Sequence, residues 1–205
     1  MQRVATDLLK ALQRQYVRAE KTAQRVDALL SSRKLTEYDA DQIYSGIFLS
    51  AFVTYERFIE EIFIGYLLGK VSPHKSKLKT LLVIPNREVA ITILSGDRNY
   101  VDWLPFSRTR DRAATYFVGP TPFATIGSTE LQMMDELSII RNALAHKSEH
   151  AHKKFVGKVI GSTSLRPRDK VPEKYLRSVF RLNPAQTRLQ HYLTQMLLVS
   201  NKLCQ

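Results

Sequence analysis

The sequence predicts an all-α protein, a helical bundle with two long central helices and several short helices. Apolar residues recur at steps of three and four over most of the chain, and Gly-, Pro- and Ser-rich stretches separate the periodic segments. No internal repeat and no strand-like alternation of useful length is found. A chain of 205 residues can bury a core without covalent staples, so we expect one domain over residues 1–205.

Two long helices are expected in the first third of the chain. The first runs from about Gln2 to Leu30, where apolar residues follow helical spacing among Lys, Arg, Gln and Glu. The second covers about 37–69 and begins at Thr36 or Glu37. Its apolar surface is wider than one stripe, which is typical of a helix that contacts neighbours on several sides.

Shorter elements are expected in the middle of the chain. Residues 69–85 form a basic connector, in which His74 is expected in a surface loop. A short helix over 86–94 should end at Ser95-Gly96, and residues 97–106, with the only tryptophan, should form an irregular packed segment. A further short helix is predicted over 109–117.

A motif helix is predicted over about 128–147. Ser128 or Thr129 can cap it, since Thr129 with Gln132 fits a capping box. Its buried stripe should comprise Leu131, Met134, Leu137, Ile140 and Leu144. A flexible basic loop over about 157–172 and two last helices, over about 172–182 and 184–203, complete the prediction.

The motif helix carries an arginine and a histidine five positions apart, Arg141 and His146. The guanidinium is a permanently charged anion clamp, and the imidazole carries protons near neutral pH. On one continuous helix the two side chains lie about 140° apart, whereas a helix that ends near Ala145 would allow them to converge. The alternative interpretation is a solvated arginine and a histidine near a helix C-terminus, where cations are favoured.

The run from Arg141 to His146, Arg-Asn-Ala-Leu-Ala-His, resembles the R-x4-6-H signature of the HEPN superfamily, in which Asn often follows the Arg. The resemblance is closest to the bacterial HEPN-like nucleases of the RiboL-PSP and MAE_28990/MAE_18760 kind. Three further stretches occur in the same order, so the likeness covers roughly residues 40 to 180; they are 51–60, 102–106 and 119–123.

The resemblance implies a bundle that dimerises with its two motifs facing each other and often acts as a metal-independent endoribonuclease, with toxin, phage-defence or RNA-processing roles. Arg141, Asn142 and His146 match the motif residue by residue. Glu56 matches an acidic position that some members use with the Arg and His; alternatively, it belongs to the solvated strip of a central helix. Other members bind without cutting, and an antitoxin or a nucleotidyltransferase-like protein is a further expected partner.

The implied reaction needs no cofactor. A ribose 2′-hydroxyl attacks the adjacent phosphorus while His146, with an ordinary pKa of roughly 6.5, carries protons. Arg141 would hold the phosphate bidentately, and Asn142 would fix the imidazole or the backbone beside it. One histidine cannot easily serve as acid and base at once, which favours a dimer. The product would carry a 2′,3′-cyclic phosphate, and DNA would be inert.

The charge of the chain favours a polyanionic partner. Thirty-one Lys and Arg against 19 Asp and Glu give a formal charge of +12, and the basic residues crowd 147–181. RNA is therefore the expected partner, contacted by Lys147, His150, Lys153 and Lys154. A basic surface that serves only solubility is the alternative. His146, His150 and His152 form H-x3-H-x-H, but their basic neighbours disfavour a cation, so no metal is expected.

The sequence also predicts a cytoplasmic protein that does not enter a membrane. The first residues contain no apolar targeting segment, no window approaches eighteen apolar residues, and the single cysteine, Cys204, allows no disulfide within one chain. Three functions remain open at this point: an RNA-cutting homodimer, a non-catalytic module that binds RNA or a protein partner, and a helical adaptor without a specific ligand.

Overall fold

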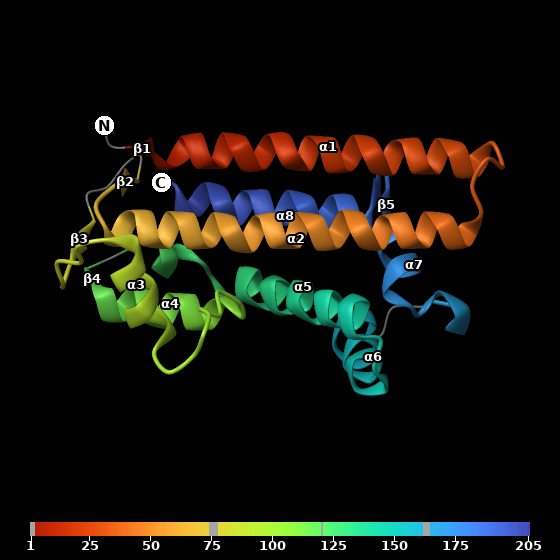
Figure 1. Ribbon diagram of the computed structural model, residues 1–205. Helices are drawn as coiled ribbons and strands as arrows, with labels where there is room; N and C mark the ends of the chain where they lie inside the picture. The colour runs from red at the N-terminus through yellow and green to blue at the C-terminus, as the bar shows by residue number, and fades with distance from the viewer. Residues whose placement is uncertain (1–2, 74–77, 120, 162–164) are drawn as a thin grey trace. The chain divides into compact units, whose positions relative to one another are not determined.

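The computed structural model describes residues 3–73, 78–119, 121–161 and 165–205, and it confirms the all-α class (Figure 1). Within these residues the chain forms eight α-helices and three two-stranded sheets. None of the helices in the described ranges is both long enough and apolar enough to cross a membrane.

The two long helices are α1 (Ala5–Ser31) and α2 (Glu37–Leu67), close to the predicted bounds. A reciprocal cap explains where α2 begins. The amide of Thr36 donates to the Asp39 carboxylate at 3.0 Å, and the amide of Asp39 donates to the Thr36 hydroxyl at 3.1 Å. These two bonds satisfy donors that a helix start leaves unpaired.

The predicted short helix after the connector is confirmed as α3 (Arg87–Ser95). The side chain of Asn86 accepts from the amide of Val89, and Gly96 ends the helix at a φ of 58°, which favours glycine. The irregular segment that follows packs Trp103 at 4% exposure, and α4 (Phe106–Tyr116) comes next. Residues 74–77, which include His74, lie outside the described residues.

Short strands accompany these helices. Strand β1 (Arg3–Val4) pairs in parallel with β2 (Val71–Ser72), and β3 (Lys79–Thr80) pairs antiparallel with β4 (Phe117–Val118). A 3-10 turn (Pro122–Thr125) then leads towards the motif helix. Each pairing involves only two residues per strand, which is too short for a strand pattern to appear in the sequence.

The last third of the chain contains α5 (Ser128–His146), α6 (Glu149–Phe155), a π turn (Val156–Ile160), a 3-10 turn (Pro167–Asp169), α7 (Pro172–Arg177), β5 (Val179–Leu182), β6 (Ala185–Thr187) and α8 (Arg188–Leu203). Two predictions here are wrong. The expected basic loop over 157–172 is helical as far as Ile160, although residues 162–164 lie outside the described ranges. The expected helix over 172–182 ends at Arg177, and the antiparallel β5–β6 hairpin follows.

The hairpin has a local cause. Residues 179–182, Val-Phe-Arg-Leu, include a β-branched and an aromatic residue, which favour a strand. Asn183 and Pro184 follow directly, and both residue types favour turns. We predicted Pro184 in the first turn of a helix, whereas α8 begins four residues later at Arg188.

The chain forms two compact units. The first comprises residues 1–13, 54–135 and 196–205, and the second comprises residues 14–53 and 136–195. The core of the first unit is aromatic: the ring of Phe63 lies 5.3 Å from Trp103, 5.4 Å from Phe117 and 5.1 Å from Phe123 between centroids. The hydroxyl of Tyr66 donates to the carbonyl of Leu203 at 2.7 Å in the same unit.

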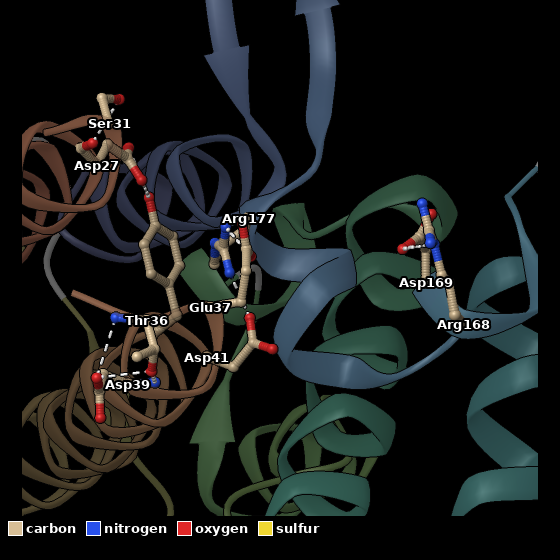
Figure 2. A network of polar contacts seen from close by, with 10 residues as sticks. Asp27, Ser31, Thr36, Glu37, Asp39, Asp41, Arg168, Asp169 and Arg177 are labelled. Atoms are coloured by element: carbon tan, nitrogen blue, oxygen red, sulfur yellow. Dashed lines mark hydrogen bonds and ion pairs between the residues drawn. The ribbon is translucent and has the colours of Figure 1, made fainter. Parts of the chain in front are cut away.

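In the second unit, Arg177 links α7 to α2. Its guanidinium contacts Glu37 at 2.8 Å and Asp41 at 2.5 Å, and it lies 5.9 Å from the centroid of the Tyr44 ring (Figure 2). The Tyr44 hydroxyl donates to the carboxylate of Asp27 on α1 at 2.9 Å. Polar contacts therefore connect α1, α2 and α7 within this unit.

A second chain of contacts connects three more elements of this unit. The hydroxyls of Tyr175 on α7 and Tyr192 on α8 are 3.2 Å apart, and Tyr192 donates to Glu136 on α5 at 3.2 Å. The ring of Phe155 on α6 meets Tyr175 edge-on at 5.4 Å. The end of α5, which carries the motif, is thus part of a packed structure.

Candidate functional site

The motif helix α5 begins with a cap that differs from the predicted one. The carboxylate of Glu130 accepts from the amide of Gly127 at 3.0 Å, so Glu130 is the residue that reaches back, and the proposed pair of Thr129 and Gln132 is wrong. Lys202 on α8 donates to the same carboxylate. The hydrogen bond from Lys202 is the main reason that the pKa of Glu130 lies below its ordinary value.

The apolar side of α5 is buried as predicted, with one exception. Met134, Leu137 and Ile140 are fully buried and Leu144 is 5% exposed, whereas Leu131 is only half-buried. Burial of this stripe fixes which side of the helix faces water. It leaves Asn142 and His146 exposed and Arg141 half-buried.

The end of α5 decides how the motif side chains are arranged. The helix continues through His146, and the next residue, Lys147, leaves it with a φ of 44°. Ser148 then caps α6, because its side chain accepts from the amide of Ala151 at 3.2 Å. Arg141 and His146 therefore lie on one helix about 140° apart, and the arrangement in which a helix ending near Ala145 lets them converge does not occur within one chain.

The motif side chains are available to solvent. Arg141 donates from Nη1 to the side-chain oxygen of its neighbour Asn142 at 2.9 Å, which orients the guanidinium along the helix surface. His146 is exposed and makes no hydrogen bond or ion pair with the described part of the chain. The imidazole can therefore accept or donate a proton without first breaking a contact.

Exposed basic residues follow the motif on and beside α6. Lys147, His150, Lys153 and Lys154 are all exposed, as expected for residues that contact RNA. Lys153 forms an ion pair with Glu149 at 2.7 Å, which compensates part of its charge. The rest of the positive charge faces solvent, while Ala151 and Phe155 form the buried side of α6.

Two other sequence interpretations concern a metal and Glu56. Among the described residues no group of His, Cys, Asp or Glu side chains is arranged to hold a metal ion. Glu56 is half-buried on the part of α2 that belongs to the first unit, whereas the motif belongs to the second. The role of Glu56 beside the motif stays a prediction.

One pair of stacked rings is not predicted from the sequence. The ring of Phe180 on β5 stacks on the imidazole of His191 on α8, with centroids 3.8 Å apart and an interplanar angle of 18°. A sequence signal for this arrangement exists. Thr187 and Gln190 form a reciprocal T-x-x-Q capping box at 2.9 and 3.3 Å, which fixes the start of α8 and hence the position of His191.

Comparisons of the chain with protein-family models, with curated proteins and with solved structures found no match.

Proposed function

We propose that the protein is a metal-independent endoribonuclease that acts as a homodimer, with a toxin or phage-defence role. The observation that carries the proposal is the exposure of the motif: Arg141, Asn142 and His146 reach solvent from the last turns of a helix whose apolar side is buried. Exposed Lys147 and Lys154 follow in sequence, and their charge favours a phosphate backbone.

The residues suit cleavage by the RNA's own 2′-hydroxyl. That oxygen attacks the adjacent phosphorus, the bond to the 5′-oxygen breaks, and a 2′,3′-cyclic phosphate remains. His146 transfers a proton at one of these oxygens, and Arg141 stabilises the charge on the phosphoryl group. The hydrogen bond from Arg141 to Asn142 supports a preset position for the guanidinium.

A second copy of the chain supplies what one copy lacks. Arg141 and His146 diverge by about 140° on their helix, so one phosphate does not reach both within one chain. Two facing copies would bring the Arg of one to the His of the other, so that each phosphate meets one guanidinium and one imidazole.

The test is an RNA-cutting assay in the presence of a chelator. We expect the purified protein to cut mixed RNA, to leave 2′,3′-cyclic phosphate ends and to leave DNA intact. His146→Ala and Arg141→Ala should each reduce cutting by at least about a hundredfold. Arg57→Ala, which removes an exposed arginine of α2, is the matched control and should cut normally. Cutting that survives either motif substitution would refute the proposal.

The same assay ranks Glu56. We expect Glu56→Ala to reduce cutting less than His146→Ala, because a carboxylate that orients other groups contributes less than a group that transfers the proton. A loss equal to that of His146→Ala would give Glu56 a larger role than proposed.

A second candidate function is a non-catalytic module that binds RNA or a nucleotidyltransferase-like partner. The exposed cations of α6 favour it equally, since binding requires charge but no proton transfer. RNA that binds and stays intact would support this function. Absence of both binding and cutting would favour a helical adaptor.

A further inference from the structure

A second surface in the same unit combines an exposed aromatic ring with positive charge. We call it the hairpin surface, and it consists of Phe180 and Arg181 on β5 with Arg188 and His191 on α8; Leu182 follows Arg181 on the strand. Phe180 is 46% exposed and Leu182 is 83% exposed. Neighbouring large apolar residues that stay exposed often mark a binding surface.

The ring pair of this surface is held in place. Arg188 at the start of α8 donates from Nη1 to the Ser178 hydroxyl at 2.6 Å and to the Val179 carbonyl at 2.9 Å. Its backbone amide donates to the Ser178 carbonyl at 3.0 Å. These bonds fasten the hairpin to α8, so the stack of Phe180 on His191 is formed before any ligand arrives.

The charged residues in the stretch of sequence that carries these rings are all basic. From Lys174 to Gln205 the chain contains no Asp or Glu. Arg177 is compensated by Glu37 and Asp41, but Arg181 is exposed. Burial, with Arg181 and Arg188 nearby, lowers the pKa of His191, so this imidazole is a neutral ring at pH 7 and the arginines supply the charge.

An exposed ring beside uncompensated arginines suits an unpaired nucleotide better than an apolar protein partner. A base of single-stranded RNA offers a flat face that stacks on an aromatic side chain, whereas a duplex keeps its bases stacked inside. The arginine then contacts the flanking phosphate. An apolar protein partner would gain from Leu182 and Phe180 but would meet the arginines unpaired.

We propose that the hairpin surface binds single-stranded RNA, with an unpaired base stacked on Phe180 and a flanking phosphate at Arg181. The inference rests on the proposed function in taking RNA as the ligand, and it adds that the substrate is unpaired. The motif and the hairpin surface belong to the same unit.

The test measures RNA binding in the His146→Ala background, where the RNA stays intact. The probe is a fluorescent oligouridine of about 12 nucleotides, a length that single-strand binding sites cover. Phe180→Ala should weaken binding about tenfold or more, because it removes the ring on which the base stacks. Phe180→Trp should bind as the parent does. Arg181→Gln should make the plot of log affinity against log salt concentration shallower, reducing the magnitude of its slope by about one.

Leu182→Ala is the matched control, because it removes a more exposed apolar side chain of the same strand that has no ring. It should bind RNA within about twofold of the parent, since stacking requires a π face. Circular dichroism of each variant checks that the fold is retained. If Leu182→Ala weakens binding as much as Phe180→Ala and also lowers the oligomeric mass, the surface is a contact between copies and the inference is overturned.

Three further outcomes separate this inference from the proposed function. Folded Phe180→Ala that binds RNA like the parent overturns the inference, even if the native protein cuts RNA. Binding to a duplex that depends equally on Phe180 overturns the preference for unpaired RNA. Conversely, a native protein that never cuts RNA but loses binding with Phe180→Ala supports the inference and removes the catalytic proposal.

Discussion

Arg177 shows how one side chain joins elements that are distant in sequence. Its side chain is 15% exposed and Asp41 is 13% exposed, while Glu37 is 68% exposed. The planar guanidinium can contact both carboxylates at once and still lie over the Tyr44 ring. The pair with Asp41 is therefore shielded from water, and the pair with Glu37 is largely screened by it.

We expect Arg177→Ala to lower the free energy of unfolding by about 2 kcal/mol, between the effects of losing a surface and a fully buried ion pair. The loss arises because Asp41 is left shielded without a cation. Urea denaturation measures it. Glu37→Gln, which removes the exposed partner, should cost less than about 0.5 kcal/mol. If Arg177→Ala lowers the free energy of unfolding no more than Glu37→Gln does, the charge of Asp41 is stabilised by water and not by Arg177.

A functional residue can be proposed from sequence where the signal is local. Arg141, Asn142 and His146 can be proposed because the motif is contiguous, and their role stays a prediction; the buried stripe on the same helix explains why Asn142 and His146 are exposed. Arg177 is not found, because its partner Asp41 lies 136 positions away and neither neighbourhood indicates the other. The role of Glu56 stays a prediction because Glu56 is also far in sequence from the motif residues that it would orient.

At the scale of the element, the start of α5 depends on one carboxylate. Glu130 accepts from the amide of Gly127 at 3.0 Å and also contacts Lys202, and a negative charge in the first turn favours the helix. The pKa of Glu130 is lowered, mainly by the hydrogen bond from Lys202. A lowered pKa means that the carboxylate stabilises the fold above its ordinary value of 4.5, and that this contribution is lost as pH falls through the folded pKa.

Glu130→Ala should lower the free energy of unfolding by about 0.5–1 kcal/mol at neutral pH. At an acidic pH below the folded pKa of Glu130, the difference from the native protein should shrink, because the carboxyl is then protonated in both the folded and the unfolded state. Thermal unfolding at the two pH values measures this change. Glu130→Gln keeps an acceptor for Gly127 but has no charge, so it isolates the pH-dependent part. A difference that is equal at both pH values would contradict the assigned role of the charge.

Helix α2 contains two glycines with opposite requirements. A Cβ at Gly65 would clash with a methyl carbon of Val71 on β2, whereas a Cβ at Gly46 would meet nothing within 4 Å. Gly65→Ala should therefore destabilise the protein by about 1–3 kcal/mol through overpacking. Gly46→Ala should stabilise it by up to about 1 kcal/mol, because alanine favours a helix. Denaturation midpoints of the two variants should move in opposite directions, and a shift in the same direction would show that Val71 gives way.

Helices and strands are predicted well from the sequence where the periodic pattern of apolar residues is long. Helices α1 and α2 have many turns of periodic apolar residues, so their bounds are predicted within a few residues. The β5–β6 hairpin is missed because four and three strand residues carry almost no periodicity. The sequence does not determine where α5 ends, because a single residue decides it. The left-handed backbone of Lys147 places that end after His146.

At the scale of the whole molecule, the proposed reaction depends on more than one copy. The chain has a formal charge of +12, which favours polyanions in general and does not by itself select a site for cutting. Selection would come from bringing a guanidinium and an imidazole to the same phosphate. Helical geometry separates those groups within one chain, so the arginine and the histidine of each site would belong to different copies.

Mixing two inactive variants tests this arrangement. Arg141→Ala retains His146, and His146→Ala retains Arg141, so a mixed dimer contains one complete site and one that lacks both groups. Random exchange of subunits makes half of the dimers mixed, and the mixture should recover about one quarter of the native cutting rate. A double variant with both substitutions, mixed with Arg141→Ala, is the control and should recover nothing. If mass measurement shows mixed dimers and the cutting rate does not rise, each site takes both groups from one chain, and α5 must then unwind near Ala145 when RNA binds.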